Sequence, residues 1–209
     1  GPSAPGTADW WDPNGDGLSV WTAYQPKGAA SLAASYADLS GKGHPCAPGV
    51  APAWDAVNGW KANGTTHYLA TTFTPAQDQS QSMLIQFSNL TNADHIAGMD
   101  QADVGGFFIS PNESASGLYR NGTTTWAISP KTSGNVGIAG NRAYVEGIAV
   151  GAAIGAYTGP PTNAVNLLAR TWNATPTNFA AVYMQAAVIY DVTLTAGQVL
   201  AVATAMAAL

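Results

Sequence analysis

The segment Phe179-Ala-Ala-Val-Tyr-Met-Gln-Ala-Ala-Val-Ile-Tyr-Asp-Val-Thr193 decides the fold of this chain. Successive side chains of a β-strand point to opposite faces, so a strand shows its pattern with a period of two. One predicted face carries mainly apolar side chains: Val182, Met184, Ala186, Val188, Tyr190 and Val192. The other carries Tyr183, Gln185, Ile189 and Asp191. An alternation of this length predicts a long central strand, and therefore a protein built on β-sheets.

Shorter segments with the same pattern occur along the rest of the chain. Ser82 to Leu90 places Met83, Ile85 and Phe87 on one face, which is typical of a half-buried strand. Weaker strand candidates are Trp21 to Tyr24, Thr66 to Thr74, Gly105 to Ser110, Ala143 to Gly151 and Asn163 to Ala169. Their number and spacing predict an all-β sandwich of two sheets.

Glycine marks two of the predicted turns between these strands. Asn121-Gly122 is a dipeptide typical of a tight hairpin turn. The glycine-rich run Gly134-Asn-Val-Gly-Ile-Ala-Gly140 has the wrong spacing for a phosphate-binding loop, and it predicts a turn between strands.

One helix is predicted, at the C-terminal end of the sequence. Thr195 and Gln198 have the spacing of a capping box. The residues that follow form an apolar stripe of helical period, made of Val199, Val202, Ala203 and Met206. Its polar face carries no lysine or arginine, so packing on its own domain is favoured over binding to a membrane surface. We expect this helix to cap the sandwich.

Length and charge limit the possible organisation and partners. The 209 residues fit one sandwich domain over 9–209, with 1–8 as a tag remnant or linker. A net charge of −5 with only seven lysines and arginines argues against binding to nucleic acid or to an anionic membrane. No apolar stretch reaches the ~20 residues needed to span a bilayer, which argues against membrane insertion. Cys46 is the only cysteine, so an intrachain disulfide is excluded.

Four segments carry a resemblance to a known family. The run from Val188 to Val199 resembles the closing strand and "iYdr.Ls..ev" ending of laminin G-like and pentraxin-like domains. Tyr24 to Tyr36 and Trp60 to Leu69 resemble the opening segments of such domains in phage-like and environmental sequences. Ile138 to Gly147 is similar to their "l YvNG" hairpin, with Val-Glu in place of the Asn-containing turn. The resemblance covers Val20 to Leu209 and implies a concanavalin A-like lectin/glucanase fold, a two-sheet antiparallel jelly roll with a short C-terminal α-helix.

Catalytic motifs are weakly represented in the sequence. Glycoside hydrolysis usually needs two carboxylates across the scissile bond, and Glu113 and Glu146 are the only glutamates. Neither belongs to the closely spaced acidic strand motif of the glucanases in this family. No nucleophile elbow, phosphate loop or dinucleotide fingerprint is present. A glycan hydrolase or lyase is still an alternative, because Tyr144, Arg142 and His67 could converge in space.

Metal ligands are sparse as well. The histidines are scattered, which argues against zinc. In Asp12-Pro-Asn-Gly-Asp-Gly17, the side chains of Asp12, Asn14 and Asp16 could turn three oxygens toward one calcium ion. Ala23 stands where an EF-hand loop has its closing acid, and an ordinary turn is the alternative. Calcium is thus a possible cofactor, in keeping with the family resemblance.

Tryptophans provide the clearest candidates for contact with a ligand. An indole ring stacks on the apolar face of a sugar, while neighbouring amides bind its hydroxyl groups. The candidates in polar, turn-forming segments are Trp10, Trp11, Trp126 and Trp172, with the amides of Asn112, Asn121, Asn166 and Asn173. Trp21, Trp54 and Trp60 are expected in the core or at strand edges, and Trp10-Trp11 could instead tie down the N-terminal segment.

These observations lead to a ranked set of functions. The first is a non-catalytic carbohydrate-binding or host-recognition module, displayed on a phage-like virion or another extracellular surface, with a glycan or host-surface polysaccharide as its partner. The second is a structural virion protein, of the capsid-decoration or tail type, that binds other virion proteins or copies of itself. The enzyme on the same fold ranks third.

Overall fold

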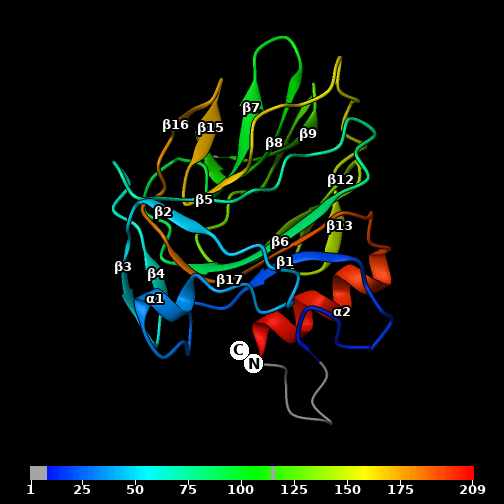
Figure 1. The fold of residues 1–209 in the computed structure, drawn as a ribbon. Coiled ribbons are helices and arrows are strands. Elements are labelled where there is room, and N and C mark those ends of the chain that lie inside the picture. The colour runs from blue at the N-terminus through cyan, green and yellow to red at the C-terminus, as the bar shows by residue number, and fades with distance from the viewer. Residues whose placement is uncertain (1–8, 114–115) are drawn as a thin grey trace.

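Two largely antiparallel sheets face each other in the computed structural model, which describes residues 9–113 and 116–209 (Figure 1). The first sheet has the order β13 (Ile148–Val150), β12 (Arg142–Val145), β11 (Gly134–Ala139), β6 (Ser82–Ser88), β17 (Tyr183–Tyr190), β4 (Gly59–Lys61) and β3 (Ala53–Asp55), with β1 (Val20–Tyr24) also on β17. The second has the order β10 (Thr125–Ile128), β9 (Ser116–Gly122), β8 (Gly105–Glu113), β7 (Ala97–Gln101), β14 (Asn166–Leu167), β5 (Tyr68–Ala70) and β2 (Ala47–Val50). The predicted all-β sandwich of two sheets is confirmed.

A hairpin extends the second sheet at β7. Its strands are β15 (Arg170–Trp172) and β16 (Thr175–Thr177), which pair with each other antiparallel. β15 also pairs with β7 in parallel, with Trp172 opposite Asp100. This hairpin positions the site described below.

The central strand β17 confirms the strongest sequence prediction and corrects one part of it. Between Met184 and Ala186 the register against β6 shifts by one residue, which is a β-bulge at Gln185. Met184 therefore shares the core between the sheets with Ala187 and Ile189, while Ala186 lies on the opposite face. The predicted single face from Val182 to Val192 is wrong, because the extra residue of the bulge reverses the alternation.

Both faces of β17 are buried as a result. One faces the core between the sheets, which contains Trp60, Phe87 and Phe107. The other lies under the C-terminal helix, where a second cluster contains Val188 and Tyr190.

The C-terminal helix α2 (Ala196–Ala207) begins where the sequence predicted. The side chain of Thr195 accepts a hydrogen bond from the backbone N–H of Gln198, whose own side chain accepts the backbone N–H of Thr195. The buried residues are the predicted stripe of Val199, Val202, Ala203 and Met206. The helix covers the outer side of the first sheet (Figure 1). A shorter helix, α1 (Leu32–Ser35), begins at an N-cap serine.

Several weaker predictions need correction. Ala143 to Gly151 is a hairpin of β12 and β13 that turns at Glu146 and Gly147, both with positive φ. Gly134 to Gly140 is strand β11 and not a turn, because it pairs with both β6 and β12. The turn predicted at Asn121-Gly122 is present, because these residues end β9 and begin the connection to β10, whose last pair is Arg120 with Thr125.

Two further strand predictions are confirmed only in part. Thr66 to Thr74 and Asn163 to Ala169 are strands only over the short β5 and β14. Residues 1–8, predicted as a tag remnant or linker, lie outside the described residues. Among the described helices, none is long and apolar enough to cross a membrane.

Candidate functional site

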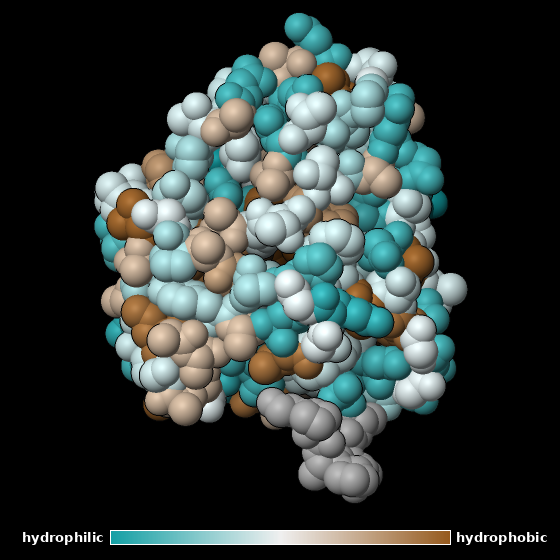
Figure 2. Space-filling model, in the orientation of Figure 1, coloured by the Kyte–Doolittle hydropathy of each residue, from teal (hydrophilic) through white to brown (hydrophobic). Residues whose placement is uncertain are grey.

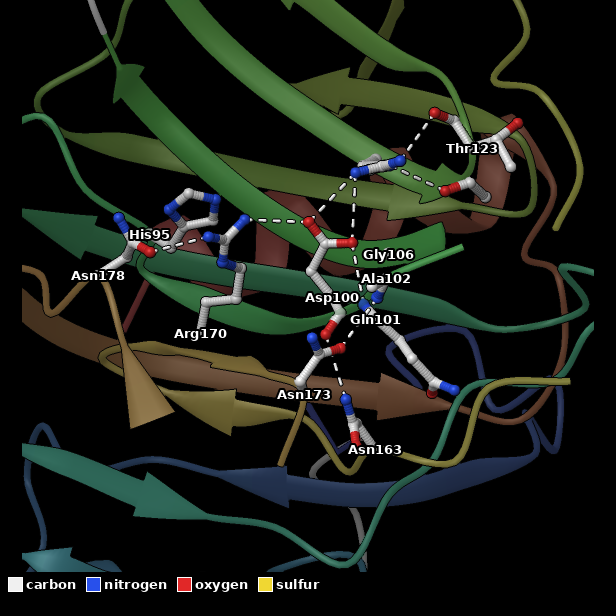
Figure 3. A network of polar contacts seen from close by, with 12 residues as sticks. His95, Asp100, Gln101, Ala102, Gly106, Thr123, Asn163, Arg170, Asn173 and Asn178 are labelled. Carbon is white, nitrogen blue, oxygen red and sulfur yellow. Dashed lines mark hydrogen bonds and ion pairs between the residues drawn. The ribbon is translucent and has the colours of Figure 1, made fainter. Parts of the chain in front are cut away.

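The outer face of the second sheet carries a charged cluster. In β7, Ala97 and Met99 enter the core between the sheets. Strand alternation therefore puts Asp100 on the outer face. Arg170 from β15 reaches the same place (Figure 3). Arg120 from β9 contacts the same carboxylate. Three segments far apart in the sequence thus converge at one carboxylate.

Asp100 is the centre of this cluster. Its side chain is 4% exposed, and Oδ2 lies 3.1 Å from Nη1 of Arg120 and 3.0 Å from Nη1 of Arg170. Oδ1 accepts the backbone N–H of Gln101 and a second bond from Arg120. The buried carboxylate is therefore paired, as a buried charge requires, and the three residues together carry a net charge of +1.

Most of the other N–H groups of the two arginines also donate hydrogen bonds. Arg120 donates to the backbone carbonyls of Gly122 and Thr123, at 2.9 and 2.8 Å. Arg170 donates from Nη2 to Oδ1 of Asn178 at 2.8 Å. Both guanidinium groups also lie over the ring of Phe108, with Cζ to centroid distances of 5.9 and 5.6 Å. The cluster is thus fixed in position before any ligand arrives.

An open cavity of about 360 Å³ lies beside this cluster. Its wall contains Asp100 and Arg120 from the sheet and Trp172 from the hairpin. Trp172 is 39% exposed, although large aromatic side chains are usually buried. Cζ of Arg170 lies 5.2 Å from the centroid of its ring and supports the indole. The remaining lining residues are Gln101, Ala102, Asp103, Val104, Gly105, Thr123 and Thr158.

Several residues with unfavourable backbone conformations lie around the same cavity. Asn173, at the tip of the β15–β16 hairpin, has φ of 44° and accepts the backbone N–H of Ala102 with its side chain at 2.9 Å. Ala174 follows with φ of 66°, in a region that residues with a Cβ seldom adopt. Other non-glycine residues with positive φ near the site are Asp103, Leu168 and Asn178. Strain of this kind persists where the surrounding structure enforces it, and it is common at functional sites.

His95 is the buried neighbour of the cluster. It is 2% exposed and packs edge-on against Phe108, with ring centroids 4.5 Å apart. Burial, and secondarily the charge of Arg170, lower the pKa of His95 to about 3. Nε2 of His95 lies 3.8 Å from Oε2 of Glu113, a separation that would favour a charged histidine. That distance is too long for a hydrogen bond, so desolvation dominates and the imidazole is neutral at pH 7.

The structure brings only part of the predicted binding set to this cavity. Trp172 lines it and Asn173 closes its hairpin edge. Asn166 lines a neighbouring cavity, which is described below. Trp126 is half-buried on β10 and packs against the core, while Asn112 lies on β8 outside both cavities.

Three of the residues predicted to contact a ligand are buried. Asn121 is fully buried, where Nδ2 donates to the carbonyl of Gly140 and Oδ1 accepts from Gln81 and Tyr157. Trp10 and Trp11 pack at right angles to each other in the cluster under α2. The alternative interpretation, in which these two rings hold the N-terminal segment, therefore fits the structure.

The predicted calcium loop forms a turn. The carboxylate of Asp12 accepts the backbone N–H groups of Asp16 and Gly17, both at 2.9 Å. Asn14 and Asp16 are exposed. In residues 9–113 and 116–209, no three histidine, cysteine, aspartate or glutamate side chains are placed to hold a metal. The loop therefore has the ordinary turn that the sequence left as the alternative, and calcium binding by Asp12, Asn14 and Asp16 stays a prediction.

The candidate catalytic residues do not come together. Glu113 is on β8 of the second sheet, whereas Glu146 is in the β12–β13 turn of the first. Tyr144 is buried on β12 of the first sheet, while His67 precedes β5 of the second. Arg142 donates to the carbonyl of Gly151.

Sequence reasoning missed Asp100, Arg120 and Arg170. A signal was present, because only 9% of the residues are charged and these three lie within strands. In Arg170-Thr-Trp172 the two-residue spacing puts the arginine and the indole on one face. The sequence did not show which strands are neighbours in the sheet, because Asp100 and Arg170 are 70 residues apart.

This protein resembles known proteins in its structure but not in its sequence. No protein-family model matches the sequence, and no curated protein matches it. The structure is similar to Trypanosoma rangeli sialidase in complex with 2,3-difluorosialic acid, with a TM-score of 0.61 and 13% identity, covering 97% of this chain and 35% of that chain. It is also similar to the binding domain of botulinum neurotoxin serotype G, with a TM-score of 0.60 and 12% identity, covering 88% of this chain and 50% of that chain.

A third likeness is to the binding domain of botulinum neurotoxin serotype D, with a TM-score of 0.60 and 12% identity, covering 89% of this chain and 50% of that chain. The chain spans a third to a half of the length of these proteins. Identities of 12–13% show the fold alone. The fold is a concanavalin A-like jelly-roll β-sandwich, as the sequence resemblance implied.

Proposed function

We propose that this protein is a non-catalytic carbohydrate-binding module whose ligand occupies the cavity beside Trp172. The observation that carries the proposal is an exposed indole held over a polar cavity by Arg170. An indole of this kind stacks on the apolar face of a pyranose. The polar groups around it are fixed in advance, which lowers the entropic cost of binding.

The carboxylates of the cavity favour binding over hydrolysis. Both carboxylate oxygens of Asp100 already accept hydrogen bonds from the two guanidinium groups and from the backbone N–H of Gln101, so neither is free to attack a substrate. Asp103 is the only other acidic residue among the described lining residues. Glycoside hydrolysis usually needs one carboxyl group that can donate a proton and a second that stays ionised.

Two further observations support a binding module. The structural neighbours include a sialidase and neurotoxin binding domains, so the same sandwich occurs in proteins whose names refer to a sugar or to binding. On the face shown in Figure 2, apolar residues are scattered among hydrophilic ones. A large contiguous apolar patch is the usual mark of an assembly surface. Display on a virion or extracellular surface stays a prediction, supported by the low charge content.

Replacing Trp172 by alanine is expected to weaken glycan binding by about 100-fold, the size of effect seen when a central aromatic contact is removed. Trp172→Phe should keep part of the affinity, because a smaller ring still stacks. Trp126→Phe, on β10 outside the cavity, is the matched control and should bind like the wild type. Binding would be measured by isothermal titration calorimetry with the best ligand from a glycan array.

The array would be run with calcium and with a chelator, and free glycans would be followed for cleavage. Binding without cleavage, lost in the Trp172→Ala protein, is the expected result. Cleaved products would contradict the non-catalytic proposal. Equal binding by wild type and Trp172→Ala would place the site elsewhere. Loss of binding in chelator would restore the calcium hypothesis.

A further inference from the structure

A second open cavity, of about 340 Å³, lies on the other side of the β15–β16 hairpin. Thr171 lines this cavity, whereas its neighbour Trp172 lines the first. Adjacent residues of a strand point to opposite faces, so the hairpin separates the two cavities. The other lining residues are Tyr68, Ala70, Thr71, Thr162, Asn163, Ala164, Asn166, Ala174 and Pro176.

Asn166 is the residue that suggests a ligand here. It is only 5% exposed, it lines the cavity, and its side-chain amide forms no hydrogen bond with any described residue. Its polar atoms are not sealed away from solvent, so they face the open cavity, where a ligand hydroxyl can replace water as their partner. Oδ1 of Asn163 is unpaired among the described residues too, while its Nδ2 donates to the backbone carbonyl of Asp100. Together they offer a ligand both a donor and acceptors.

A ridge of hydrogen-bonded residues separates the two cavities. Gln101 of the first cavity accepts hydrogen bonds from the backbone N–H and the hydroxyl of Thr162 of the second, at 2.9 and 3.1 Å. Asn173 forms the other part of the ridge through its bond to Ala102. A ligand longer than one sugar can therefore contact both cavities without unfolding any element.

The charges of the lining residues indicate an uncharged ligand. None of the described residues of the second cavity is charged. In the first, Arg120 is paired with Asp100, and Asp103 adds a negative charge. Counting Arg170, which shares Asp100, the two arginines and two aspartates of the first cavity sum to zero. Neither cavity therefore has the net positive charge by which carboxylate or sulfate groups are usually recognised.

We infer that the ligand is an extended, uncharged oligosaccharide that occupies both cavities, with one unit against Trp172 and another against Asn166. This inference rests on the proposed function and specifies the class of glycan. The amides and hydroxyls of the second cavity bind sugar hydroxyl groups, and the first cavity supplies the stacking contact.

The experiment is an affinity series with neutral oligosaccharides of one to six units, built from glucose, mannose, galactose and xylose. Sialyllactose and oligogalacturonate serve as acidic probes. We expect the affinity to rise once the chain reaches both cavities and then to level off. Asn166→Ala should lower the affinity for the hexasaccharide by about tenfold, the effect of losing one or two hydrogen bonds.

Two further variants sharpen the test. Ala70→Trp fills the second cavity from β5 and should remove the dependence on chain length. Ala127→Trp adds the same bulk to exposed Ala127 on β10 and is its matched control. Asn141→Ala, in an exposed turn, is the control for Asn166→Ala.

The outcomes separate this inference from the proposed function. If a single sugar binds as tightly as a hexasaccharide, or if Asn166→Ala binds the hexasaccharide normally, the two-cavity ligand is wrong while the sugar site at Trp172 stands. Tighter binding of the acidic probes than of the neutral oligosaccharides would contradict the inference that the ligand is uncharged. If no saccharide binds, the proposed function fails and this inference fails with it.

Discussion

Replacing Asp100 by alanine is expected to lower the free energy of unfolding by about 3–5 kcal/mol, the usual result of removing one partner from a buried ion pair. Asp100 is 4% exposed on its side chain, and Arg120 and Arg170 both depend on it. Without the carboxylate, two guanidinium groups would be left close together and partly buried. Asp100→Asn keeps the shape but not the charge, so we expect a loss of similar size.

Urea unfolding followed by tryptophan fluorescence would measure this loss. Asp191→Ala is the matched control, because Asp191 is exposed and its side chain forms no hydrogen bond with a described residue. The control should unfold like the wild type. Glycan binding should fall in the Asp100 variants as well, since Arg170 supports the ring of Trp172. An Asp100→Ala protein as stable as the wild type would show that the cluster does not hold the hairpin.

Acid is expected to destabilise the protein through His95, beginning near pH 6.5. Burial lowers the pKa of His95 in the folded state from 6.5 to about 3. Below pH 6.5 the unfolded chain binds a proton at this histidine and the folded protein does not. Stability therefore falls with falling pH, by up to about 1.4 kcal/mol per pH unit, until the pH reaches the folded pKa. Between pH 6.5 and pH 4 the loss from this residue is about 3 kcal/mol.

The measurement is the free energy of unfolding in urea at several pH values between 7 and 4. His95→Gln should flatten the curve in this window, because glutamine takes up no proton. The slope of the unfolding free energy against pH is compared, so a loss of stability that is the same at every pH does not affect the result. Curves of equal slope for wild type and His95→Gln would mean that the histidine titrates normally in the folded protein.

The sequence by itself determined the elements whose causes are local. The capping box of Thr195 and Gln198 and the apolar stripe of α2 depend on residues within a few positions, and the helix formed as predicted. The patterns in 82–88 and 183–190 likewise predicted two central strands, although the bulge in the second changed which faces its side chains take. The family resemblance led to the jelly-roll fold for the same reason, since its motifs describe strands and turns.

Tertiary structure alone decided which strands lie side by side, and with that the candidate site. The bulge at Gln185 arises from pairing with β6, so no local pattern announces it. Asn121 looked like an exposed turn residue, but contacts with Gln81 and Tyr157, 40 and 36 residues away, bury it. Asp100 meets Arg120 and Arg170 across 20 and 70 residues of sequence. Alternation predicts on which face of its strand a side chain lies. A site forms only where several strands lie close together in one sheet and point their side chains to the same face of that sheet.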